Sequence, residues 1–328
     1  MSEKLQWAIL GTSFISGVMA EAIIAEGRGQ IYGVAARNTE TLNAFADQYG
    51  IAVRTTDFEA LIHDDKVDVV YIGLPTHLHH QYTELAAQAG KAIVCEKSLS
   101  VDMEKTDAAL AAAAHHKVFF AEGLMYLHHP FTAKIAELIQ QGAIGGIRAI
   151  SGHYCADIAQ FANPQSGGTL FNLGCYPTSL AHLLLQQQFG SQVFDNIQIT
   201  ALGRRDAHGN LDETAMTARL NNGVMLQLHT AEDYGLDHGF TILGTTGILR
   251  CISNPWLPGA DNILHLTPYE QPTEEIRVTA DGDAFLYQVR NVTDAIRAGQ
   301  LELERPAARH QDSRQIMSLL TQWQAAAG

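Results

Sequence analysis

Short apolar runs alternate with amphipathic stretches along the first 122 residues. Continuous apolar runs predict buried strands at residues 7–10, 30–36, 52–54, 67–72, 92–95 and 118–121. The intervening stretches of about 10 to 15 residues carry apolar positions at helical spacing. Strands buried on both faces read as continuous apolar runs, and strand–helix alternation is typical of a doubly wound parallel sheet. Residues 1–122 are therefore predicted to form an α/β domain.

The pattern changes after residue 147, where strand-like segments follow one another. They lie at residues 147–154, 197–202, 214–220, 224–229, 240–243, 248–251, 263–267 and 275–278. The turns at 221–223 and 244–247 read as hairpin connections. Apolar and polar positions alternate in 214–220, as in a sheet covered on one face. Residues 123–328 are predicted to form a mostly antiparallel, open-faced α+β domain with closing helices at 284–298 and 311–326, and the open face predicts a homodimer.

Composition limits the choice of function. The chain has 328 residues, 46% hydrophobic residues and a net charge of −14, which disfavours a nucleic-acid partner. No apolar run reaches about 18 residues, so no membrane span is expected. The four cysteines form no C-x-x-C pair, and Met1–Lys4 leads into the first strand without a signal-peptide pattern. These features predict a cytoplasmic protein.

The end of the first strand resembles a dinucleotide fingerprint. The three positions of G-x-G-x-x-G are Gly11, Ser13 and Ser16, so the match is degenerate. Gly11 permits a tight turn, and the amides of residues 12–15, Thr12, Ser13, Phe14 and Ile15, begin a helix. A helix N-terminus attracts phosphate through its free N–H groups and its dipole. An ordinary strand–turn–helix remains the alternative, but the alternating strands favour a dinucleotide site.

Arg37 follows the second predicted strand, where NAD sites usually carry a carboxylate for the ribose. An arginine there can hold the 2′-phosphate of NADP in a bidentate fork. We therefore predict NADP(H) rather than NAD(H). The alternative is a plain surface arginine in a protein that uses both cofactors.

Two further stretches carry candidate chemistry. Glu96 and Lys97 stand at the end of the fifth predicted strand, at the sheet edge where ligands bind. Asn172 and Tyr176 are four residues apart and share a face if one helix runs through both. Pro177 must then kink that helix or start a new one. The histidines, several of them adjacent, show no repeated acid–His spacing, so we expect no metal site.

These motifs resemble those of the Gfo/Idh/MocA oxidoreductases, and most closely the dimeric dihydrodiol dehydrogenase and glucose–fructose oxidoreductase branch. The matching stretches are Gly11-Thr12, Leu74-Pro75-Thr76 with His79, Gly90-Lys91, Glu96-Lys97, Glu122, Met125-Tyr126, His129-Pro130 and Gly174-Cys175-Tyr176-Pro177. The resemblance implies a nicotinamide-binding Rossmann domain followed by an antiparallel sheet domain. It also implies cofactor contacts at Leu74, Pro75, Thr76, His79, Glu96, Lys97 and Glu122.

The resemblance implies that Tyr176 is the acid/base, with Lys97 as its activator or as a second proton donor. A tyrosine with a pKa of about 10 is ionised to roughly one part in a thousand at pH 7, and a nearby ammonium favours the phenolate. Two residues depart from the family pattern. Ser98 replaces a proline, which leaves Lys97 less restrained. Asn172 replaces an aspartate, so its side chain can orient a hydroxyl but cannot carry a charge or transfer a proton.

The leading interpretation is an NADP(H)-dependent oxidoreductase acting on a sugar, polyol or cyclic diol. The aromatic residues Phe14, Tyr126, Tyr154 and Phe161 either line its substrate pocket or belong to the core. Tyr176 as a packing residue, and Lys97 paired with Glu96, are the structural alternatives. Two other functions stay open: a dinucleotide-binding regulator without turnover, and a lyase or hydrolase with tightly held NAD.

Overall fold

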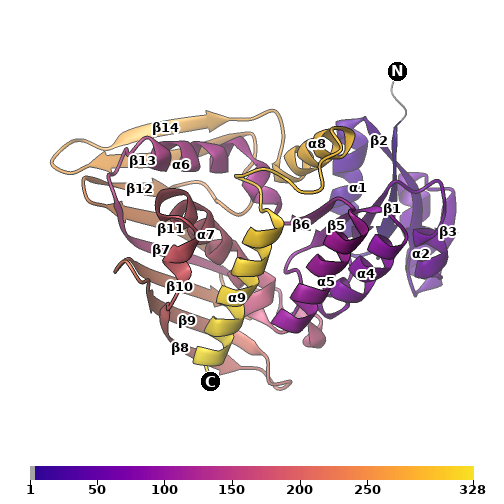
Figure 1. Ribbon diagram of the computed structural model, residues 1–328, viewed down its shortest axis with the longest axis horizontal. Helices are drawn as coiled ribbons and strands as arrows, with labels where there is room; N and C mark the ends of the chain where they lie inside the picture. The colour runs from indigo at the N-terminus through magenta and orange to yellow at the C-terminus, as the bar shows by residue number, and fades with distance from the viewer. Residues whose placement is uncertain (1–3) are drawn as a thin grey trace. The chain divides into compact units, whose positions relative to one another are not determined.

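The computed structural model describes residues 4–328 and divides them into two compact units (Figure 1). The first unit runs to Met125 and also includes Phe285–Ser313. The second comprises Tyr126–Ala284 and Arg314–Gly328. Residues 285–313 thus return to the first unit, whereas the sequence-based range assigned them to the second. Residues 1–3, part of the stretch without a signal-peptide pattern, lie outside the described residues.

The first unit is built on a six-stranded parallel sheet with the order β3-β2-β1-β4-β5-β6. Its strands are β1 (Leu5–Leu10), β2 (Gly29–Ala35), β3 (Val53–Thr55), β4 (Val69–Ile72), β5 (Ala92–Glu96) and β6 (Phe120–Gly123). The helices are α1 (Phe14–Glu26), α2 (Thr39–Tyr49), α3 (Phe58–Ile62), α4 (His79–Gln88), α5 (Met103–His116) and α8 (Ala284–Arg297). The strand order reverses between β1 and β4, the topological switch point where ligands bind in such sheets. The predicted doubly wound sheet is confirmed.

Buried apolar side chains hold the sheet and its helices together. Trp7, Ile9, Val69 and Tyr71 are fully buried in one core with apolar residues of α1 and α2. Val292 of α8 belongs to the same core. This packing explains why the stretch beyond Phe285 returns to the first unit.

The second unit contains an eight-stranded sheet with the order β14-β13-β12-β11-β7-β10-β9-β8. Its strands are β7 (Ile147–Ala156), β8 (Gln198–Arg205), β9 (Leu211–Arg219), β10 (Met225–Ala231), β11 (Leu236–Gly244), β12 (Gly247–Cys251), β13 (Asp261–Pro268) and β14 (Glu274–Thr279). All neighbouring pairs are antiparallel except β7 and β10, which run parallel. Both predicted hairpin turns, β9–β10 and β11–β12, are confirmed.

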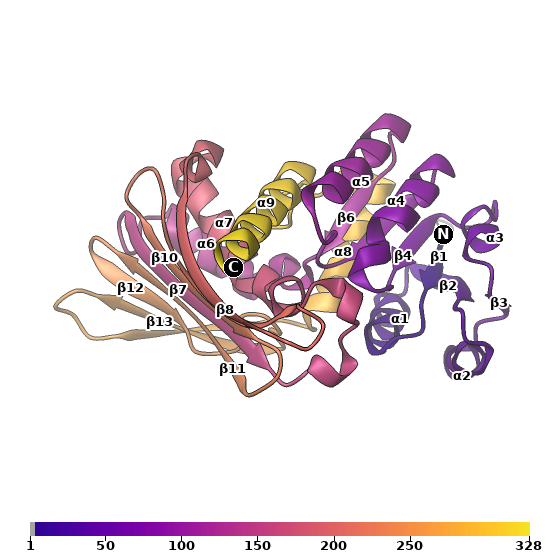
Figure 2. The ribbon, with the colours of Figure 1, turned by 90° about the horizontal axis from the view of Figure 1, so that it is seen from below.

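One face of this sheet is covered and the other is open. Helices α6 (Pro130–Gln140) and α7 (Cys175–Phe189) lie on the covered face, as Figure 2 shows. Along β9, Met216 and Ala218 are buried while Ala215 and Thr217 are exposed. The alternation in the sequence therefore reports correctly which side chains face the core.

One helical run passes through both Asn172 and Tyr176, with a local π turn within it. Residues Leu170–Gly174 form a π-helical turn, and α7 begins at Cys175. Pro177 lies in the first turn of α7, just after the π turn, and cannot donate a helix hydrogen bond. Gly174 and Cys175 both have αR backbone angles, so the helix continues across this point, and Asn172 lies in the π turn of the same helix. Turns of this kind occur frequently at functional sites.

One helix cap differs from simple pattern reading. Ser100 stands in a good position to cap α5, but Asp102 is the N-cap, and its carboxylate accepts a bond of 2.8 Å from the Lys105 amide. Ser100 Oγ instead donates to Asp102 O at 2.7 Å. The helix therefore begins at Met103.

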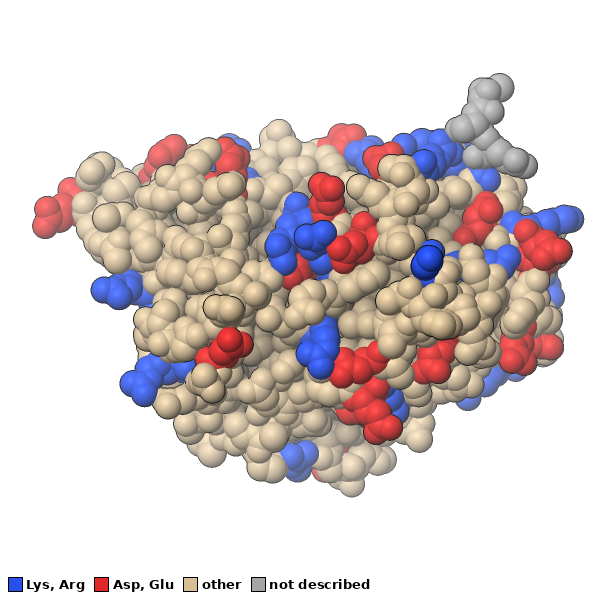
Figure 3. Space-filling model, viewed as in Figure 1, with Lys and Arg blue, Asp and Glu red and all other residues tan. Residues whose placement is uncertain are grey.

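The surface mixes charges of both signs. In Figure 3, Lys and Arg side chains are interspersed with Asp and Glu over the face in view. Among residues 4–328, no helix is both long enough and apolar enough to cross a bilayer. The closing helix α9 (His310–Ala326) ends the chain, and its Trp323 donates a bond of 3.0 Å to Thr214 Oγ1 in the second unit.

Candidate active site

The turn after β1 has the shape that a phosphate group requires. Gly11 has a φ of 99°, and a Cβ at this position would lie 2.6 Å from the carbonyl oxygen of Gly73. Its amide donates a bond of 2.8 Å to Ala35 O. Only glycine accepts both this φ and this close approach. The turn and the loop after β4 are therefore packed backbone to backbone.

The first turn of α1 leaves its amides available for an anion. Ser13 holds the N-cap position, but its side chain makes no bond to the helix amides. Ser13 Oγ lies instead 3.2 Å from Ser16 Oγ and donates to Gly73 O at 3.3 Å. Phe14 is 86% exposed and Ile15 is half-buried. Uncapped amides at a helix N-terminus are the donors that a pyrophosphate uses, so these residues fit a dinucleotide.

Arg37 is exposed and lies two residues after the end of β2. Thr12 Oγ1 donates to Thr41 Oγ1 at 3.2 Å, so the turn adjoins the start of α2, the helix that follows Arg37. The pKa of His77 is lowered by burial and, next, by the positive charge of Arg37. The guanidinium therefore lies close to the loop after β4. This position suits a charged group at the adenosine end of a dinucleotide.

Lys97 follows β5, whose last residue is the buried Glu96. Glu96 Oε1 accepts a bond of 2.8 Å from the Tyr71 hydroxyl, and Oε2 accepts one of 3.3 Å from the Lys97 amide. Burial raises the pKa of Glu96, while the Lys97 charge acts in the opposite direction. Lys97 itself is half-buried. The lysine is thus fixed by its backbone at the sheet edge that also carries Gly11.

His79 and Glu122 hold the segment after Lys97. One ring nitrogen of His79 lies 2.8 Å from Ser98 O and the other 2.7 Å from Leu74 O. The Leu99 amide donates a bond of 2.9 Å to Glu122 Oε1. The Lys97–Ser98 peptide is cis. We expected Ser98 to leave Lys97 less restrained, but both residues that follow Lys97 are buried and hydrogen-bonded by their backbone.

Burial also sets the protonation of these two side chains. It lowers the pKa of His79 to about 4, against the bonds to Leu74 and Ser98. It raises the pKa of Glu122 to about 7, against bonds from Ser313 and Leu99. His79 is therefore neutral at pH 7, and Glu122 is protonated in part.

Tyr176 lies in an aromatic cluster of the second unit. Its ring centroid is 5.3 Å from that of Tyr154, 5.7 Å from that of Tyr126 and 6.2 Å from that of Trp256. The Tyr126 hydroxyl lies 3.0 Å from Tyr176 O and donates to it. Tyr126 and Tyr154 are buried, whereas Phe161 is 81% exposed. Two of the four aromatic candidates, Tyr126 and Tyr154, have ring contacts with Tyr176.

Asn172, in the π turn, has a partner that the sequence did not indicate. Its Nδ2 donates a bond of 2.6 Å to Glu232 Oε2, and Glu232 is 4% exposed. Glu232 directly follows β10 and belongs to no spaced motif. The sequence feature that could have marked Glu232 as a site residue is its place immediately after an apolar strand.

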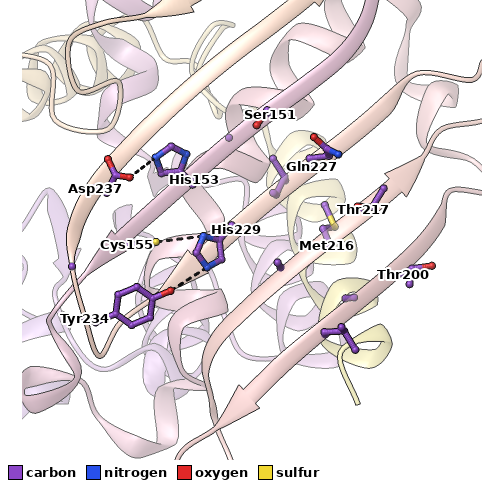
Figure 4. Close-up of a pocket in the computed structure, with 16 residues that line it drawn as sticks. Ser151, His153, Cys155, Thr200, Met216, Thr217, Gln227, His229, Tyr234 and Asp237 are labelled. Carbon is purple, nitrogen blue, oxygen red and sulfur yellow. Dashed lines mark hydrogen bonds and ion pairs between the residues drawn. The ribbon is translucent and has the colours of Figure 1, made fainter.

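A hollow of about 650 Å³ lies on the open face of the second unit and contains none of the predicted site residues (Figure 4). Within it, Cys155 Sγ lies 3.7 Å from His229 Nδ1, and the Tyr234 hydroxyl lies 3.4 Å from His229 Nε2. Burial raises the pKa of Cys155, so its thiol is not an activated nucleophile. Among residues 4–328, no group of three or more His, Cys, Asp or Glu residues is arranged to hold a metal ion.

Fold and sites define the class of protein. Residues 5–124 match a family model described as an oxidoreductase family with an NAD-binding Rossmann fold, and residues 132–250 match the GFO/IDH/MocA C-terminal domain. The chain belongs to the Gfo/Idh/MocA family of oxidoreductases, as the sequence motifs predicted.

Particular relatives cover most of the chain. It is similar to dTDP-3,4-didehydro-2,6-dideoxy-alpha-D-glucose 3-reductase of Streptomyces violaceoruber, with 31% identity over 86% of this chain and 82% of the relative. Trans-1,2-dihydrobenzene-1,2-diol dehydrogenase of Bos taurus is 25% identical over 91% of this chain and 90% of its own.

A solved structure shares the fold. It is a 3-ketoreductase from Actinomadura kijaniata in complex with NADP and TDP-benzene, which matches with a TM-score of 0.87. The two chains are 23% identical, and the match covers 99% of this chain and 98% of the ketoreductase.

Proposed function

We propose that this protein is an NADP(H)-dependent oxidoreductase that interconverts a carbinol and a carbonyl on a sugar, polyol or cyclic diol. The observation that carries the proposal is the order of groups along one sheet edge. Gly11, the loop at Leu74 and the hydrogen-bonded segment at Lys97 follow β1, β4 and β5, which are neighbouring parallel strands. A phosphate turn beside a fixed lysine is the arrangement that such a reaction needs.

The chemistry divides between the cofactor and the side chains. When bound, the nicotinamide accepts the hydride of the carbinol or supplies it to the carbonyl. The hydroxyl of Tyr176 takes up or gives the proton at the substrate oxygen. The Lys97 ammonium stabilises the phenolate or donates a proton itself. Asn172 orients a substrate hydroxyl through its amide.

The NADP preference rests on Arg37 and on the absence of a carboxylate at the end of β2, among Ala35, Ala36 and Arg37. Relatives support it: the ketoreductase structure contains NADP, and a D-xylose 1-dehydrogenase of Haloferax volcanii is named for NADP(+). The names of the other relatives refer to a deoxy sugar and a cyclic diol, which supports the substrate class.

The test is steady-state turnover of a panel of aldoses, inositols and dicarbonyls, followed at the absorbance band of reduced nicotinamide with both cofactors. We expect Lys97→Met and Tyr176→Phe to lower kcat by about 100-fold or more, because acid–base catalysis contributes about 10² to 10⁴. Lys134→Met and Tyr32→Phe are matched controls, because Lys134 pairs with Glu137 and the Tyr32 hydroxyl donates to Asp64, outside the proposed site. Wild-type turnover in either site variant would remove that residue from the mechanism.

The same assay separates the other functions. Cofactor binding without turnover of any substrate would indicate a regulator. Product formation without net change in the nicotinamide band would indicate a lyase or hydrolase with retained cofactor.

We also propose that the open sheet face joins two copies into a homodimer. Its outward residues on the central strands are mostly small or uncharged, such as Ser151, Thr217 and Gln227, and Leu202 and Leu236 nearby are each 82% exposed. Charged side chains on this face are paired within it, Arg204 with Glu213 and Asp237 with His153. Light scattering should give about twice the chain mass of 35.7 kDa, and Leu202→Glu with Leu236→Glu should give the monomer. A wild type that stays monomeric at every concentration would contradict the proposal.

All four cysteines are buried thiols outside any disulfide. Free thiols support the proposal that the protein works in the reducing cytoplasm.

A further inference from the structure

The π turn that carries Asn172 is tied to the sheet of the second unit at three points. Gly168, with a φ of 81°, forms an isolated bridge with Leu211, and a Cβ on it would lie 2.3 Å from Leu211 O. Thr169 Oγ1 lies 2.8 Å from Thr230 Oγ1 in a buried contact. The third point is the bond of 2.6 Å between Asn172 Nδ2 and Glu232 Oε2. The sheet therefore fixes the position of Asn172.

Glu232 is itself firmly held. Its amide donates a bond of 2.9 Å to Asp212 O, and its carbonyl accepts bonds of 2.8 Å from the amides of Ile158 and Ala159. Its side chain is almost fully buried. Both ends of the Asn172–Glu232 bond are thus anchored to regular structure.

The carboxylate decides which way the Asn172 amide faces. Asn172 Nδ2 donates to Glu232 Oε2, so the NH₂ group of Asn172 faces Glu232. The amide is planar, and its Oδ1 is then directed away from Glu232 as a hydrogen-bond acceptor. A neutral amide at position 232 would satisfy either orientation and would lose this selection.

We propose that Glu232 is a positioning residue that holds Asn172 so that Oδ1 accepts a hydrogen bond from a substrate hydroxyl next to the reacting carbinol. Asn172 lies one turn before Tyr176, so the recognised hydroxyl is adjacent to the group that Tyr176 serves. The inference rests on the proposed function and narrows its substrate class to vicinal diols and polyols. A mono-alcohol gains nothing from this pair.

The experiment uses the full chain with NADP, and trans-cyclohexanediol and cyclohexanol as probes beside the best substrate of the panel. We expect Glu232→Gln to raise KM for vicinal hydroxyl substrates about 10-fold, with kcat and the KM of NADP within about 3-fold of wild type. KM for the mono-alcohol should stay unchanged. A KM effect that is confined to one substrate class is not expected from general loss of structure.

A swap of the two groups provides the rescue. Asn172→Asp places two carboxylates in contact and should lower kcat/KM about 100-fold. Asn172→Asp combined with Glu232→Gln restores an amide–carboxylate pair and should return kcat/KM to within about 5-fold of wild type. In an Asn172→Ser background, Glu232→Gln should have no further effect on KM. Thermal unfolding confirms that each variant is folded.

Two results would overturn the inference while leaving the proposed function intact: a wild-type KM in Glu232→Gln, or a double variant no better than Asn172→Asp. Failure of the proposed function looks different, because the wild type then turns over no carbinol or carbonyl with either cofactor.

Discussion

Glu122 gives the protein a pH-dependent stability that one substitution can isolate. The carboxyl group is 2% exposed, and its Oε1 accepts the Leu99 amide at 2.9 Å. Its Oε2 is buried without a hydrogen bond among residues 4–328, and Ser313 and Leu99 lower the pKa of the carboxyl by less than burial raises it. The charged form therefore loses hydration that the protein only partly replaces. Replacing Glu122 by Gln keeps an acceptor for Leu99 and removes the titration.

The magnitude follows from the raised pKa of Glu122, which is about 7 against an ordinary value of 4.5. Between pH 4.5 and 7, the Glu122 carboxyl keeps its proton in the folded protein and has lost it in the unfolded chain. The group's stabilising effect is therefore fully present below pH 4.5 and is lost as pH rises to 7. Each pKa unit corresponds to 1.36 kcal/mol, so the free energy of unfolding should fall by roughly 3 kcal/mol.

The assay is denaturant unfolding of wild type and Glu122→Gln in identical buffers between pH 4.5 and 8. The result is the difference between the unfolding free energies of wild type and variant at each pH. The difference removes the contribution of His79, whose lowered pKa of about 4 makes stability rise with pH over part of the same range. The wild type should lose roughly 3 kcal/mol relative to the variant as pH rises. Glu104→Gln, at an exposed site, should show no such change. Parallel curves for wild type and Glu122→Gln would refute the reasoning.

Three further substitutions test the cofactor turn and the aromatic cluster. Gly11→Ala should lower the free energy of unfolding by about 2 kcal/mol and weaken NADPH binding about 10-fold or more, because φ at Gly11 is 99° and a Cβ would lie 2.6 Å from Gly73 O. Thermal unfolding measures the loss of stability, and fluorescence titration measures the loss of NADPH binding. Arg37→Ala should raise KM for NADPH about 10-fold or more and leave KM for NADH nearly unchanged, and an unchanged ratio of the two would remove Arg37 from cofactor selection. Tyr126→Phe should cost roughly 1 to 2 kcal/mol in urea unfolding, since its hydroxyl bonds to Tyr176 O at 3.0 Å; a loss below the error of the fit would contradict this.

The fold could be predicted because hydrophobic periodicity reports burial directly. Continuous apolar runs such as residues 69–72 are buried on both sides, and alternation along 214–220 corresponds to one covered face. Both signals are local, so a single sequence contains them. The return of residues 285–313 to the first unit was missed because it depends on long-range packing around Val292.

The placement of some candidate residues was predictable from the strand pattern, although their roles remain predictions. Gly11 and Arg37 stand at strand ends, and their positions follow from the strand pattern. Glu232 was not among the predicted site residues, because its proposed role depends on a contact with Asn172, which lies 60 residues away in the chain. Ser100 and Asp102 are nearly equal as N-cap residues, so the sequence alone does not decide which of them begins α5.

A crystal structure with NADP and a turned-over substrate tests the central claim most directly. We predict the pyrophosphate at the amides after Gly11, the 2′-phosphate at Arg37, and the substrate oxygen within about 3.2 Å of the Tyr176 hydroxyl, with the Lys97 ammonium beside them. A substrate oxygen bound out of hydrogen-bonding reach of both Lys97 and Tyr176 would contradict the account.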